Sequence, residues 1–162
     1  MNKKKRKISV IAGGAGFIGI NLINELNKLG NKIIILDNFS LGSKNNLDNF
    51  LESSDYVLYE IDISKSSDVK GFFDECIKDY GKIDEIWHLA ANSDIPAGIE
   101  NPDIDHVNTF LTTYRLLRES SKYDIETFNF ASSSAVYGDW GDKSLSEKLG
   151  PLKPISNYGA MK

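Results

Sequence analysis

The chain has 162 residues, enough for one domain with a proper core but not for a second sizeable domain. Its net charge of −4 and its pI near 5.2 give no basic field of the kind that nucleic-acid binding needs, so we expect no nucleic-acid partner. A single cysteine, Cys76, excludes an internal disulfide and a multi-cysteine zinc site. No metal site is expected, and the lone thiol fits a reducing, cytoplasmic location.

The N-terminal segment 1–7 is strongly basic and precedes an apolar run, as in a secretory signal peptide. That run contains four glycines within ten residues, lacks a convincing small-residue cleavage site and leads directly into a helical pattern with Asn and Glu. We therefore interpret 1–7 as a solvated tail on a first strand. No stretch approaches 18 apolar residues, so the sequence predicts no membrane span.

The segment Val10–Gly19, VIAGGAGFIG, is typical of a strand, a tight turn and the start of a helix. Glycines let the backbone bend sharply and approach a ligand, and the free amides at the helix start favour a pyrophosphate. Two forms of the dinucleotide fingerprint fit, one with Gly14, Gly16 and Gly19 and one with Gly13, Gly16 and Gly19. A Walker A loop would need Lys and then Ser or Thr next, but Ile20 and Asn21 follow.

The second predicted strand decides between a plain glycine turn and a dinucleotide site. Lys32–Leu36 reads as a buried strand of a parallel sheet, and Asp37 closes it about 20 residues after the glycines. A carboxylate there can accept both ribose hydroxyls of NAD. The residues that follow, 38–40, are neutral, whereas an NADP site would usually offer a basic side chain. The sequence therefore favours NAD.

The rest of the chain alternates helical and strand patterns. We expect further strands at Ile8–Ile11, Tyr56–Ile61, Ile83–Ala90 and Thr127–Ala131. Helices are expected from the glycine turn through Leu22–Leu29, from a cap within Ser66–Asp68 to Gly81, at Ile104–Ser121 and at Ser156–Lys162. The segments 38–49 and 138–154, and the segment around Pro96 and Pro102, read as loops. This order predicts an α/β, Rossmann-like, doubly wound open parallel sheet of about five strands with helices on both faces.

Ligands of such sheets lie beyond the carboxyl ends of the strands. That places the glycine turn, Asp37, Asp62, His88–Ala91 and Ser132–Ser134 in view. Ala90 and Ala91 either let a flat cofactor approach or simply pack in the core. For His88 we favour a core histidine bonded to backbone over an acid or base, because it has no carboxylate partner in view. Cys76 lies in an apolar helical stripe and is predicted to be a buried thiol.

Tyr158 and Lys162 are four residues apart, so they share one face of a helix. An ammonium group lowers the pKa of a neighbouring phenol, which can then act as a general base or acid. The same spacing also occurs on ordinary exposed helices. Its place after a dinucleotide fingerprint and a strand-end serine cluster favours catalysis.

Together these motifs resemble the extended short-chain dehydrogenase/reductases, and within them the NAD-dependent nucleotide-sugar epimerase/dehydratase family, its UDP-sugar 4-epimerases above all. The resemblance runs over the whole chain and rests on Gly13–Gly19, Asp37-Asn38, Asp62-Ile63, His88–Ala91, Asn101-Pro102, Ser132–Gly138 and Pro154-x-Ser156-x-Tyr158-x-x-x-Lys162.

The resemblance implies a role for each matched residue. Implied cofactor-binding residues are Gly13, Gly16, Phe17, Ile18, Gly19, Asp37, Asn38, Asp62, Ile63, Leu89, Ala90, Ala91, Ala131, Tyr158 and Lys162. Ser133 would hydrogen-bond the sugar hydroxyl being oxidised, and Tyr158 would take its proton while hydride passes from sugar C4 to the nicotinamide. Lys162 would bind the nicotinamide ribose. The 4-keto sugar would then turn over and be reduced on its other face, which regenerates NAD.

Departures from the family narrow the reaction. Dehydratases of this kind carry Asp-Glu directly after the catalytic Ser or Thr, and here Ser134 and Ala135 stand there, which disfavours dehydration. Epimerisation remains, as does oxidation coupled to decarboxylation or reduction. Thr109 stands where the family usually has a substrate-side Asn, with Asn108 one position early.

Family members continue beyond this lysine into a smaller substrate domain. We therefore expect 1–162 to be the NAD-binding Rossmann domain of a longer enzyme, with weak NAD binding and little turnover by itself. A nucleotide sugar, UDP-hexose in particular, is the expected substrate, and a helix-mediated homodimer is possible in the full-length enzyme. Two alternatives stay open: a non-catalytic NAD-binding module, and another extended enzyme such as a decarboxylase, reductase or hydroxyl dehydrogenase.

Overall fold

The structure is a computed structural model that describes residues 6–51, 53 and 55–162, so most of the basic tail expected over 1–7 lies outside the described residues. The described residues form one parallel sheet with the strand order β3-β2-β1-β4-β5. Its strands are β1 Ile8–Ala12, β2 Lys32–Asp37, β3 Tyr56–Glu60, β4 Glu85–His88 and β5 Thr127–Phe130. This is the doubly wound Rossmann-like sheet that the sequence predicts.

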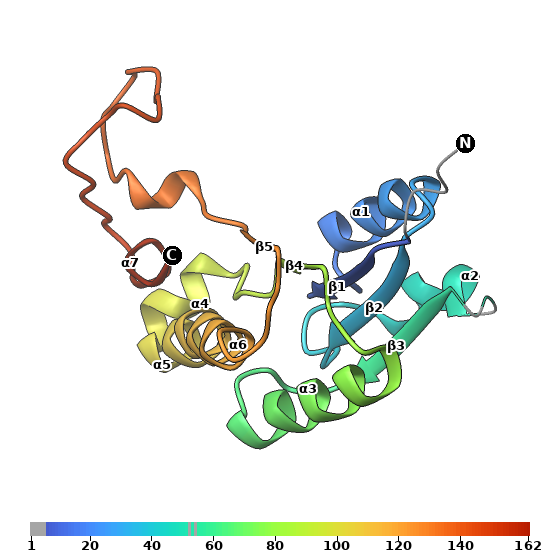
Figure 1. Cartoon of the computed structure of the whole chain (residues 1–162). Coiled ribbons are helices and arrows are strands. Elements are labelled where there is room, and N and C mark those ends of the chain that lie inside the picture. The colour runs from blue at the N-terminus through green and yellow to red at the C-terminus, as the bar shows by residue number, and fades with distance from the viewer. Residues whose placement is uncertain (1–5, 52, 54) are drawn as a thin grey trace.

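Helices cover both faces of the sheet (Figure 1). Helix α1, Phe17–Lys28, and the short α2, Asp48–Leu51, pack on one face, while α3, Ser66–Tyr80, and α6, Thr112–Ser120, pack on the other. Side chains alternate along each strand, so Ile11 of β1 faces α1 whereas its two neighbours face α3. The interior strand β2 is therefore apolar on both faces, as buried parallel strands are.

The strand order reverses direction between β1 and β4. From β1 the chain moves outward through β2 to β3, then crosses back to β4 and continues to β5. The loops that leave β1 and β4 diverge at this point, which opens a crevice at the carboxyl ends of the strands.

The loop expected over 38–49 is partly helical, which corrects the prediction. A 3₁₀ turn, η1 Lys44–Leu47, leads into α2. Most of this segment is polar and exposed, but Leu47 and Phe50 are buried against α1 and β2. Burying such a side chain contributes about 1.5–3 kcal/mol, and this orders a stretch whose composition reads as loop.

The proline-containing segment before the fourth helical pattern is also helical. Helix α4, Ile95–Glu100, and helix α5, Pro102–Asp105, both begin with a capping side chain: Asp94 accepts from Ala97 N, and Asn101 accepts from Asp103 N. Each proline sits in a first turn, where its missing N–H costs no helical hydrogen bond. The helix expected over Ile104–Ser121 is split, with a π-helical segment, η2 His106–Leu111, before α6.

Several predicted boundaries shift. Strand β4 is shorter than Ile83–Ala90, because Leu89 N and Ala90 N both donate to Ala12 O and end the ladder. Helix α1 starts at Phe17, within the glycine segment as predicted, whereas α3 follows Lys65 without a side-chain cap, so the cap expected within Ser66–Asp68 is absent. Two short elements complete the chain, η3 Ser134–Val136 and α7 Asn157–Met161.

Cys76 is fully buried on α3, and burial raises the pKa of its thiol to about 12. The prediction of a buried core thiol is confirmed. Within the described residues, no helix combines the length and apolar character that crossing a membrane requires.

Candidate functional site

A cavity of about 450 Å³ lies at the switch point between β1 and β4. The glycine turn, the ends of β2 and β3, the segment after β4 and the end of β5 line it. Its lining includes the sequence-predicted residues Gly13, Gly16, Phe17, Ile18, Gly19, Asp37, Asn38, Asp62, Ile63, Leu89, Ala90, Ala91 and Ala131. The structure thus gathers residues from five separate segments into one crevice.

The glycines of the turn are there for space as well as for conformation. Gly13 has φ +83°, and a Cβ on it would lie 2.7 Å from Ala90 N. A Cβ on Gly19 would lie 2.5 Å from Gly13 O, so only glycine lets α1 start this close to β1. The turn therefore brings bare backbone to the cavity wall, which is the surface that a pyrophosphate needs.

Helix α1 points its N-terminus into the cavity. The backbone amides of Phe17 and Ile18 have no acceptor within the described residues, as expected for a first helical turn. Phe17 is 84% exposed. Free amides and the positive end of the helix dipole suit a diphosphate at this end of the cavity.

Two carboxylates lie at the carboxyl ends of β2 and β3: Asp37 is the last residue of β2, and Asp62 follows β3 by two residues. Asp37 receives hydrogen bonds from Ala15 N and Phe39 N, both 2.9 Å long, so backbone fixes its carboxylate at the end of β2. Burial alone would raise the pKa of Asp62, but hydrogen bonds from Ser64 and the Lys65 charge lower it overall. Asp62 is therefore an ionised acceptor at the cavity wall.

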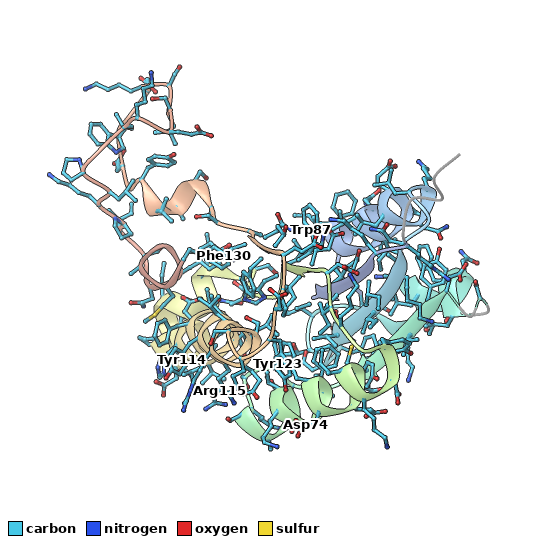
Figure 2. The ribbon with its side chains drawn as sticks, in the orientation of Figure 1. Asp74, Trp87, Tyr114, Arg115, Tyr123 and Phe130 are labelled. Atoms are coloured by element: carbon cyan, nitrogen blue, oxygen red, sulfur yellow. The ribbon has the colours of Figure 1, made fainter. Side chains whose placement is uncertain are left out.

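The predicted lysine approaches the cavity from α7. Lys162 Nζ donates to Ala131 O over 2.7 Å, and Ala131 lines the cavity. The same ammonium lies 5.7 Å from the ring centroid of Tyr158 and 5.0 Å from that of Phe130, which is labelled beside α7 in Figure 2. Burial lowers the pKa of Lys162. The structure thus brings Tyr158 and Lys162 together, as their spacing predicts.

Ser133 lies two residues after Ala131 and caps η3, where its hydroxyl accepts from Ala135 N over 3.2 Å. Helix α7 packs against this turn, because Gly159 leaves room for Ala135 O. Within residues 6–51, 53 and 55–162, however, no hydrogen bond joins Ser133 to Tyr158. The three predicted catalytic residues therefore lie on neighbouring segments, the η3 turn and helix α7 with its C-cap.

His88 is buried beneath the lysine. Its Nε2 lies 2.8 Å from Thr113 Oγ1, whose only proton goes to Thr109 O, so His88 donates and Nδ1 is left without a partner in the described residues. Burial, with a smaller effect of the Lys162 charge, lowers the pKa of His88 to about 3. The prediction of a core histidine is confirmed, but its partner is a threonine hydroxyl and not backbone.

Sequence reasoning missed part of the lining. These residues are Leu36, Ser40, Leu41, Gly42, Ile61, Ser93, Asn108 and Thr112. For Gly42 the sequence offers a signal, because this glycine follows the predicted end of β2 by a few residues. In the structure, a Cβ on Gly42 would lie 3.0 Å from Ala15 Cβ. Asn108 and Thr112 lie on one side of η2 and α6. That they face the cavity can be recognised only once the position of this helix is known. Asn108 reaches the cavity whereas Thr109 is fully buried.

Fold and site together define a dinucleotide-binding protein of the Rossmann type. The chain belongs to the NAD dependent epimerase/dehydratase family, whose sequence model matches residues 9–162. NAD is the cofactor of this family, and the residues present fit it. The glycine turn leaves a cradle that a Cβ would fill, and backbone holds a carboxylate at the end of β2.

Proteins similar to the chain include UDP-glucose 4-epimerases and UDP-glucuronic acid decarboxylases. UDP-glucose 4-epimerase of Halalkalibacterium halodurans is 29% identical over 153 residues, and UDP-glucuronic acid decarboxylase 1 of Xenopus tropicalis is 28% identical over 156. These matches cover 94% and 96% of this chain but 42% and 34% of the relatives. Thermus thermophilus UDP-glucose 4-epimerase, solved in complex with NAD, has a TM-score of 0.82 and 26% identity, covering 96% of this chain and 47% of that one. The chain thus spans less than half the length of these relatives.

Proposed function

We propose that the chain is the NAD-binding half of a UDP-sugar 4-epimerase. The observation that carries this proposal is the connection of the predicted catalytic pair to the cofactor cavity, through the hydrogen bond from Lys162 to Ala131 O. A Tyr and a Lys that occur at this spacing by chance would have no reason to contact the lining of the cavity. Here the lysine is half-buried and held at its wall.

The proposed roles follow from position. Asp37 accepts the adenosine ribose hydroxyls, while Asp62 and Ile63 flank the adenine. The amides of Phe17 and Ile18 receive the diphosphate. Leu89–Ala91 and Ala131 line the nicotinamide end. Bound NAD supplies a reversible two-electron acceptor.

The proposed chemistry lies on three side chains. Ser133 hydrogen-bonds the sugar C4 hydroxyl, and Tyr158 removes its proton and later returns it. The Lys162 ammonium, 5.7 Å from the Tyr158 ring centroid, stabilises the phenolate electrostatically and binds the nicotinamide ribose. Oxidation of the C4 hydroxyl would give a 4-keto sugar. After this sugar turns over in the pocket, its reduction on the opposite face would give the C4 epimer.

We propose a homodimer for the longer enzyme and a cytoplasmic location. The dimer is supported by an exposed aromatic row on η2 and α6, in which the rings of His106, Phe110 and Tyr114 stack at centroid distances of 5.8 and 6.1 Å. Phe110 and Tyr114 are among the exposed large side chains. The location is supported by the buried, unpaired thiol of Cys76.

A decarboxylase is the second candidate, and the Xenopus relative is the observation that favours it. It would use the same oxidation step on UDP-glucuronic acid. A non-catalytic NAD-binding module is the third reading.

A chimera tests the proposal. The chain is joined after Lys162 to the second half of the Halalkalibacterium enzyme and assayed by NMR with UDP-glucose, UDP-N-acetylglucosamine and UDP-glucuronic acid. We expect C4 epimerisation, and its loss in Tyr158→Phe with NAD binding kept. Carbon dioxide release from the acid would favour the decarboxylase. A folded, NAD-bound chimera without turnover would favour the module.

A further inference from the structure

A buried carboxylate lies behind the cavity wall, outside the site just described. Asp105 is 0% exposed at the end of α5, and its Oδ2 has no hydrogen-bond partner within the described residues. Its other oxygen, Oδ1, accepts from Asn92 Nδ2 over 2.8 Å. A buried carboxyl oxygen without a hydrogen-bond partner is costly, so the place of Asp105 in the fold calls for a reason.

Asn92 is the residue that this carboxylate holds. The asparagine uses its whole side chain: Nδ2 donates to Asp94 O and to Asp105 Oδ1, and Oδ1 accepts from Asp94 N. Its backbone N–H donates to Thr109 Oγ1 over 3.1 Å. Its two chain neighbours, 91 and 93, both line the cavity. The conformation of this wall therefore depends on contacts that Asp105 and Thr109 provide.

The same carboxylate also holds α4. A Cβ on Gly98 would collide with the Asp105 side chain, so the carboxylate packs directly on the backbone of α4. Gly98 O in turn accepts from Asn157 Nδ2 over 2.9 Å, and Asn157 precedes Tyr158. One buried side chain thus lies between the cavity wall and the helix with the predicted catalytic tyrosine.

The π-helical segment begins directly after Asp105. Such segments free backbone carbonyls, and here hydroxyls satisfy them: Thr112 donates to Asn108 O and Thr109 O, and Thr113 donates to Thr109 O. Asn108 and Thr112 line the cavity. The widened turn thus presents two polar side chains to the cavity while its buried side holds Asn92.

We infer that Asp105 is a positioning residue, whose side-chain oxygen fixes Asn92, and with it the wall at residues 91–93, in the shape that receives NAD. The inference rests on the proposed function, since it assumes that this cavity takes the cofactor. What matters is an acceptor for Asn92 Nδ2. An amide oxygen at this position would serve as well as a carboxyl oxygen.

Two substitutions separate the acceptor from the charge. Asp105→Leu has a similar shape but no acceptor, which leaves a buried N–H of Asn92 unpaired; Asp105→Asn keeps an oxygen for it. The first readout is hydrogen exchange of the Asn92 backbone amide in the chain without NAD. The second is NAD affinity by calorimetry. The loss of one buried hydrogen-bond partner corresponds to a roughly tenfold change in the equilibrium constant, both for the opening that exposes the Asn92 amide and for NAD binding.

We expect Asp105→Leu to exchange Asn92 N–H about tenfold faster and to bind NAD about tenfold more weakly, with Asp105→Asn within about threefold of wild type in both. Asp103→Leu makes the same change at an exposed site of α5, and Cys76→Ala destabilises the core elsewhere. Neither control should change either readout.

The inference is overturned if Asp105→Leu matches wild type, if Asp105→Asn is as impaired as Asp105→Leu, or if Cys76→Ala weakens NAD equally. Should Asp105→Leu fail to fold, Thr109→Val removes the other contact of Asn92 and should speed exchange of its amide. Unchanged exchange there would also overturn the inference. A wild-type chain that does not bind NAD would contradict the cofactor proposal, while the exchange measurement still decides the role of Asp105.

Discussion

At the scale of single residues, the lysine at the cavity wall has an unusual neighbour. His88 lies beneath Lys162, fully buried, with Nε2 committed to Thr113. A protonated imidazole here would be desolvated and would repel the ammonium. The fold thus keeps His88 neutral, which leaves Lys162 the only cation of this pair.

His88 makes stability depend on pH. Its pKa is near 6.5 in the unfolded chain and about 3 in the fold, so the unfolded state binds a proton first as pH falls. Stability from this group is complete above about pH 6.5, and about 2 kcal/mol is lost between about pH 7 and about pH 5. Urea unfolding at both pH values measures this loss. In His88→Gln, which can still donate to Thr113, the loss should shrink by that amount; an equal loss in both proteins would contradict the account.

The residues of the cavity were predictable where the fold places strand ends. Asp37 and Asp62 end or follow apolar runs, so their convergence follows from a parallel sheet alone. Asn92 and Asp105 were not predictable. Their contact joins the segment after β4 to the end of α5 across 13 residues of sequence, and a single sequence carries no signal for such a pairing.

At the scale of elements, the strands were predicted closely and the short helices were not. Parallel strands buried on both faces read as continuous apolar runs, as in Lys32–Asp37. Helices α4 and α5 were missed because their prolines read as loop signals, although Asp94 and Asn101 stand before them as caps. The packing of α1 on β1 depends on glycines, because a Cβ on Gly19 would collide with the backbone of the turn.

Two glycines that both lie within helices should respond oppositely to alanine. In Gly19→Ala the new Cβ meets Gly13 O at 2.5 Å and Gly14 Cα at 2.6 Å, both backbone, so we expect a loss of about 1–3 kcal/mol in the free energy of unfolding. Gly71 lies inside α3 with nothing within 4 Å of the added Cβ. Gly71→Ala should gain about 0.5–1 kcal/mol. Urea titrations measure both, and a neutral Gly19→Ala would show that α1 can move away from β1.

At the scale of the whole molecule, the chain has a cavity at the switch point of the sheet, an exposed segment with apolar side chains and an open sheet edge. The segment 138–155 extends away from the sheet and its helices (Figure 1), and Leu152 and Ile155 on it are 55% and 78% exposed. Strand β5 ends the sheet of the described residues without a neighbour on its outer side. Both features fit the proposal that the chain is one half of a longer enzyme.

The central claim is that the crevice between β1 and β4 holds NAD. Titration of the ¹⁵N-labelled chain with NAD, followed by amide NMR shifts, tests it most directly. We predict saturable shifts that are largest at residues 13–19, 37–42 and 89–93, the segments that line the cavity. Shifts that do not saturate, or that are largest in the separate groove between α3 and α6, would contradict the account.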